Sequence, residues 1–67
     1  MSQHHHTFDS TIFYEGDEVW APDEASNTIK KAIVIFSDLS AKKAKVQFVW
    51  ESTKVAVSFR DLEPFGR

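Results

Sequence analysis

Residues 16–24 read GDEVWAPDE, and this stretch decides the fold because its apolar residues alternate with polar ones. In an extended chain, Val19 and Ala21 fall on one face, while Glu18 and Trp20 fall on the other. Pro22 cannot donate a backbone hydrogen bond, so it ends a strand that we expect over residues 18–22. With Val19 and Ala21 in the core, Trp20 is predicted to face outward.

The rest of the chain continues this two-residue period. Residues 29–36 are apolar on both faces, so we expect both faces of that strand to be packed against other residues. Residues 44–50 and 54–60 alternate. Their connection is predicted to be a tight turn at Ser52 and Thr53 or, since neither residue is glycine, a longer turn. The expected inward side chains of these two strands are Ala44, Val46, Phe48, Trp50, Val55, Val57 and Phe59. Residues 61–65 predict one helical turn, with Leu62 as a buried plug, and a short last strand.

Five short strands with no helix longer than one turn predict an all-β fold, a small five-stranded SH3-like barrel over residues 13–67. Residues 1–12 lack periodicity and are interpreted as a disordered, flexible N-terminal tail. The run His4–His6 is typical of a metal-affinity tag or its remnant. The chain has no other His and no Cys, so we expect no metal site.

Composition narrows the function classes. The chain has 67 residues, no cysteine and no apolar run as long as a membrane span, so we expect one intracellular, cytoplasmic domain without membrane contact. Residues 1–27 carry six acids and no Lys or Arg, whereas residues 28–67 carry eight bases and four acids. The absence of a His outside the tail, of any Cys and of a glycine-rich loop predicts a protein without catalytic residues or cofactors.

Two stretches resemble a known family. VWAPDE, followed by a β-branched strand and then by VAVSFRDLEPF, resembles the N-terminal SH3-like subdomain of myosin heavy chains over residues 16–65. The resemblance implies a non-catalytic docking module that contacts a neighbouring domain or a peptide. The loop after Pro22-Asp23-Glu24 departs from the family, which has a Gly-aromatic step where this chain has Ala25-Ser26-Asn27. We expect the partner-binding residues to be Trp20, Pro22, Asp23, Glu24 and Asn27.

The same outline also looks like a Tudor-like chromatin reader, on the residues Gly16, Asp17, Val19, Ala21, Val34, Asp61, Leu62 and Pro64. That resemblance implies binding of methylated or basic peptides in an aromatic cage, and a nuclear location. The candidate cage residues are Trp20, Phe48, Trp50 and Glu51. An exposed Trp50 beside Trp20 would favour the reader, and a buried Trp50 the docking module. A small nucleic-acid-binding barrel is a minor alternative, based on the lysines at 30–31 and 42–45, and a free-standing barrel of another role stays open.

Overall fold

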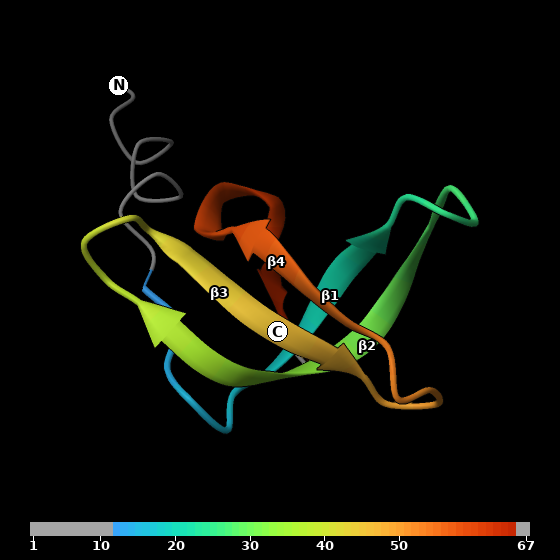
Figure 1. Ribbon diagram of the computed structural model, residues 1–67, viewed down its shortest axis with the longest axis horizontal. Helices are drawn as coiled ribbons and strands as arrows, with labels where there is room; N and C mark the ends of the chain where they lie inside the picture. Colours follow the sequence, from blue (N-terminus) through green and yellow to red (C-terminus); the bar gives the residue numbers. More distant parts are fainter. Residues whose placement is uncertain (1–11, 66–67) are drawn as a thin grey trace.

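The computed structural model describes residues 12–65 and has one five-stranded antiparallel sheet in the order β4-β3-β2-β1-β5 (Figure 1). The strands are β1 (Glu18–Asp23), β2 (Thr28–Asp38), β3 (Lys43–Phe48), β4 (Lys54–Ser58) and β5 (Glu63–Pro64). A single 3₁₀ turn, η2 (Phe59–Asp61), connects β4 to β5. The all-β class, the helical turn and the short last strand are confirmed. The predicted tail lies outside the described residues, apart from Ile12.

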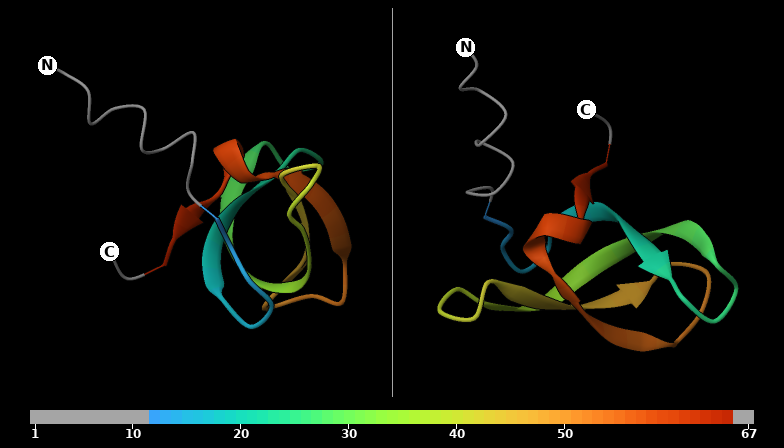
Figure 2. Two further views of the ribbon diagram at one scale, coloured as in Figure 1. Left: turned by 90° about the vertical axis from the view of Figure 1, so that its left-hand side faces the viewer. Right: turned by 90° about the horizontal axis from the view of Figure 1, so that it is seen from above.

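The long strand β2 curls the sheet. Its first half pairs with β1 and its second half with β3, and a register shift falls between Val34 and Phe36. The view down the sheet in Figure 2 shows the strands wrapping around a common centre. The ladder ends at β4 on one side and at β5 on the other, so among the described residues the sheet is open.

The inner face of this curled sheet holds the core. Val19 and Ala21 are fully buried, as their alternation with Trp20 predicts. The predicted inward residues Ala44, Val46, Phe48, Val57 and Phe59 are buried too, and Leu62 plugs the end after η2. Phe13, from the segment before β1, adds an edge-to-face contact with Phe59 at 5.7 Å between ring centroids. The core is therefore built from alternate residues of four strands.

The prediction that Trp50 points into the core is wrong, because β3 ends at Phe48. The Glu51 N–H donates to the Phe48 carbonyl at 3.1 Å, which turns the chain away from the ladder at Val49 and Trp50. The Phe48 N–H donates to the Thr53 carbonyl at 3.1 Å and closes the longer of the two expected connections. Trp50 is consequently 81 % exposed.

The apolar residues of β2 are not all covered. Ala32 and Val34 are buried, but Phe36 follows the register shift and is 54 % exposed. Ile33 and Ile35 lie on the outer face and are half-buried. The strand also runs beyond the predicted residues 29–36 at both ends, from Thr28 to Asp38. The outer face of β2 thus keeps part of its apolar surface in contact with solvent.

Candidate functional site

Trp20 lies on the outer face of β1, where Phe65, the residue after β5, reaches it. Its ring is 5.0 Å from the ring of Phe65, at an interplanar angle of 48°. The Phe65 N–H donates to the Glu18 carbonyl at 3.0 Å, which holds Phe65 beside β1 at the end of β5. Trp20 stays 38 % exposed in this arrangement. The two rings therefore form an accessible aromatic pair.

Lys31 completes this pair from the neighbouring strand. It lies directly opposite Trp20 in the β1–β2 ladder. Its Nζ is 4.1 Å from the centroid of the Phe65 ring, which is a cation–π distance. The same Nζ is 3.9 Å from Glu18 Oε1, at the outer limit of an ion pair. Lys31 is thus positioned by one ring and one carboxylate on the molecular surface.

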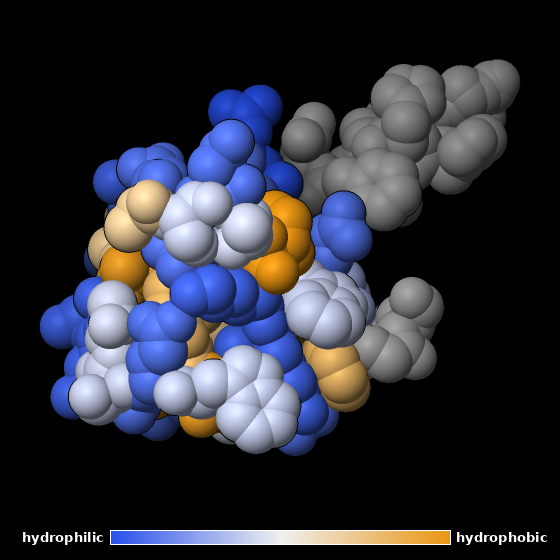
Figure 3. Space-filling view, turned by 90° about the vertical axis from the view of Figure 1, so that its right-hand side faces the viewer, coloured by the Kyte–Doolittle hydropathy of each residue, from blue (hydrophilic) through white to orange (hydrophobic). Residues whose placement is uncertain are grey.

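Trp50 and Ile29 extend the aromatic pair into a groove. The Val49 N–H donates to the Lys31 carbonyl at 3.0 Å and anchors the β3–β4 loop beside β2. A hollow of about 380 Å³ is then lined by Trp20, Ile29, Lys30, Lys31, Trp50 and Phe65, which we call the Trp20 patch. Ile29 is 62 % exposed. Figure 3 shows this end of the molecule, where hydrophobic side chains lie among charged ones on the surface.

Lys30 borders the patch but points toward the inner face of the sheet. It is opposite Ala21 in the ladder, and its Nζ lies 2.7 Å from Asp23 Oδ2 and 2.6 Å from Glu51 Oε2. The same Nζ is 5.8 Å from the centroid of the Phe48 ring. The Lys30 ammonium lowers the pKa of Asp23, and the Asp23 carboxylate, followed by that of Glu51, raises the pKa of Lys30. This trio joins the β1–β2 hairpin to the β3–β4 loop.

The remaining predicted partner-binding residues lie in or next to the β1–β2 turn. Asp23 accepts hydrogen bonds from the Ala25 N–H at 3.2 Å and from the Ser26 hydroxyl at 2.9 Å. Asn27 has a φ of 56°, a left-handed conformation that asparagine tolerates better than most residues. Pro22 is half-buried and lies opposite Ile29, whereas Glu24 is exposed. Asp23 and Asn27 therefore shape the turn, and Trp20 and Pro22 face the patch side of the hairpin.

The four candidate cage residues are not brought together around one space. Phe48 is 1 % exposed, so its ring faces are enclosed by the core. The Glu51 carboxylate is occupied by Lys30. Trp20 and Trp50 alone line a common hollow. Ile29 and Phe65 belong to the patch although the sequence analysis did not single them out, and Lys31 was considered there as a nucleic-acid contact alone.

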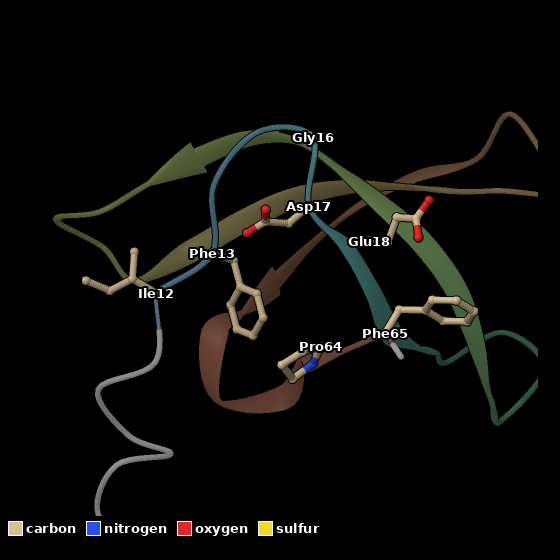
Figure 4. Close-up of a pocket in the computed structure, with 7 residues that line it drawn as sticks. All are labelled: Ile12, Phe13, Gly16, Asp17, Glu18, Pro64 and Phe65. Carbon is tan, nitrogen blue, oxygen red and sulfur yellow. The ribbon is translucent and has the colours of Figure 1, made fainter. Parts of the chain in front are cut away.

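A second hollow, of about 360 Å³, lies between the segment before β1 and the end of β5. Figure 4 shows Phe13, Asp17 and Glu18 around it, with Pro64 and Phe65 from the other side. The Asp17 carboxylate accepts the Tyr14 N–H at 2.8 Å, so it is used to close the turn before β1. Within residues 12–65, no group of His, Cys, Asp and Glu side chains could hold a metal ion.

Two further observations bear on class and family. No helix among the described residues is long and apolar enough to cross a membrane. No family model matches the chain, and no curated protein matches its sequence.

Proposed function

We propose that the protein is a non-catalytic SH3-like barrel that docks a protein segment on the Trp20 patch, as the resemblance to the myosin N-terminal subdomain suggests. The curled five-stranded sheet and the 3₁₀ turn between β4 and β5 support this fold. The observation that supports this function most directly is that Trp20, Trp50 and Phe65 line one hollow. Exposed aromatic clusters of this kind are typical of protein-binding sites, because Trp residues dominate binding energy there.

The chemistry of the patch defines its partner. Two indoles and Ile29 offer apolar contact area, and each indole adds one N–H donor. Lys31 adds a cation over the face of the Phe65 ring, with a single carboxylate at 3.9 Å as its salt-bridge partner among the described residues. The ligand is a segment of a neighbouring domain or a peptide that inserts an apolar or aromatic side chain and carries an acceptor for the lysine. From the sequence we expect a buried Trp50 for this role, and the exposure of Trp50 departs from that expectation. We revise the docking proposal accordingly: the exposed indole enlarges the docking surface.

A peptide selection tests the docking function. Random peptides are selected on the immobilised protein, and their affinities are measured for the wild type, Trp50→Ala and Leu39→Ala. Leu39 is a matched control, since it is 49 % exposed but lies in the β2–β3 turn, outside the patch. We expect the selected peptides to bind Trp50→Ala at least about tenfold more weakly and Leu39→Ala unchanged. Peptides that bind all three proteins equally would refute the proposal.

One observation favours a Tudor-like reader as the second candidate: Trp50 is exposed and lines the same hollow as Trp20. The local charges oppose it. Lys31 already lies over the Phe65 ring of the hollow, where a ligand ammonium would bind, and Lys30 lies over the enclosed Phe48 ring. These lysines are also paired with carboxylates, which weakens the case for phosphate binding.

Titration with a trimethyl-lysine peptide and its unmodified version separates the two candidates. The readout is the pair of indole N–H signals in the NMR spectrum. The docking proposal expects no difference between the two peptides, since the patch offers no free carboxylate to a ligand ammonium. A joint shift of both indole signals with the trimethylated peptide alone would establish the reader instead.

A further inference from the structure

The open sheet has two edges that differ in their protection. The β5 edge is two residues long and includes Pro64, which lacks the N–H needed to extend a ladder. The β4 edge has five residues, KVAVS, with no proline and with its one charge at the first position. Among the described residues, β4 pairs with β3 alone. Free edges of this kind accept another strand unless the sequence blocks them.

Hydrogen bonds at both ends of the β3–β4 ladder show which groups of β4 are free. The Phe48 N–H donates to Thr53 at 3.1 Å, and the Phe59 N–H donates to Lys42 at 2.9 Å. The ladder between them is regular, and antiparallel pairs alternate between bonded and non-bonded. Val55 and Val57 therefore direct their backbone groups to β3. The backbone N–H and C=O groups of Lys54, Ala56 and Ser58 point away from it, into the open edge.

The β4 sequence is complementary to itself around Ala56. An antiparallel copy centred on this residue sets Ala56 against the partner's Ala56, and Lys54 against the partner's Ser58. Residues 54, 56 and 58 of both copies then exchange about six backbone hydrogen bonds, since every group that points outward finds a partner. The valines of both strands stay on the inner face, and the small Ala56 side chains meet on the outer face, where Ala56 is exposed. No like charges face each other in this register.

We propose that a second copy of the chain pairs with β4, so that two sheets join into one across a two-fold axis at Ala56. Isologous contacts of this type are the commonest in homodimers. The contact is short and made mostly by the backbone, which places it among weak, transient interfaces, with a Kd on the order of 100 µM. This contact uses the backbone edge of β4, whereas the Trp20 patch is formed by side chains of β1, β2, the β3–β4 loop and Phe65.

The two-fold axis gives a specific test. In the dimer, residue 56 meets its own copy, so Ala56→Lys and Ala56→Glu each create like charges directly opposite each other. We expect the wild type to dimerise in analytical ultracentrifugation between 0.01 and 1 mM, on the order set by the expected Kd. Each variant alone is expected to bind itself at least about tenfold more weakly, and an equimolar mixture of the two to regain the dimer. Ala25→Lys and Ala25→Glu, in the exposed β1–β2 turn, are matched controls that dimerise like the wild type.

The folded state of each variant is checked by circular dichroism. Ala56→Glu lies opposite Lys45 in its own sheet and is the better tolerated of the two. A wild type that stays monomeric at 1 mM, roughly ten times the expected Kd, would overturn the proposal. So would charge variants that dimerise like the wild type, or a mixture that stays monomeric. Loss of the dimer in Trp50→Ala would place the contact at the Trp20 patch and would overturn it as well.

Discussion

Phe48 and Trp50 occupy equivalent positions in the alternating pattern, yet their truncation should have opposite consequences. Phe48 is 1 % exposed, and replacing a buried Phe with Ala costs about 3–5 kcal/mol. A domain of 67 residues is stable by roughly 3–10 kcal/mol, so Phe48→Ala loses much or all of its folded population. Trp50 is 81 % exposed, so about a fifth of its surface is buried. At about 25 cal/mol per Å², Trp50→Ala costs roughly 1 kcal/mol or less.

Thermal denaturation followed by far-UV circular dichroism measures both costs without relying on tryptophan fluorescence. For Trp50→Ala we expect a Tm no more than about 8 °C below the wild type, since 1 kcal/mol corresponds to about 4–8 °C in a domain of this size. For Phe48→Ala we expect no cooperative transition, or one with a much reduced midpoint. Equal losses in the two variants would show that Trp50 is a core residue after all and would refute the structure of the β3–β4 loop.

Three further results are expected. The pKa of Asp23 is lowered in the folded state. The contribution of Asp23 to stability is therefore present above its ordinary pKa of 3.8 and is lost as the pH falls through the lowered value. Asp23→Asn should flatten the acid side of a curve of unfolding free energy against pH. Lys42 has a φ of 56°, where glycine is unstrained, and Lys42→Gly should raise the unfolding free energy by up to about 1 kcal/mol in urea titrations, whereas a loss would contradict the left-handed conformation. In a Trp50→Phe background, Phe65→Ala should shift the emission of Trp20 to longer wavelength, because its ring partner at 5.0 Å is removed, and an unchanged spectrum would contradict that contact.

The period of two was sufficient to find most of the core. It placed Val19, Ala21, Val46 and Phe48 correctly, because a pleated strand sends successive side chains to opposite faces whatever its neighbours are. The same rule failed at Trp50, since it cannot tell where a strand ends. That end is decided by the turn at residues 48–51, which lacks a glycine to mark it.

The site was predictable to a smaller degree. Trp20 was placed on the surface by its neighbours in sequence, but its contacts come from other strands. Counting outward from the centre of the β1–β2 turn would have paired Trp20 with Lys31, because the ladder is regular from Asp23 and Thr28 onward. The sequence around Trp20 does not predict that Phe65 packs against it, because this contact depends on the path of the chain through η2 and β5. Contacts that depend on such long-range connections cannot be read from a pattern within one strand.

The acidic flanks of Val19 and Trp20 are explained by the β1–β2 register. Glu18 lies near Lys31, and Asp23 pairs with Lys30, so each end of the short strand is tied to a lysine of β2. A slip of one residue would turn Trp20 into the core and the valine outward. A slip of two would set one carboxylate directly opposite its lysine but carry the other away from its partner, so the observed register is the one that keeps both pairs. Individual surface ion pairs contribute little stability, but the two pairs are satisfied together in the observed register alone. The charges around Trp20 therefore specify where it lies, and in doing so they bring Lys31 beside the aromatic rings of the patch.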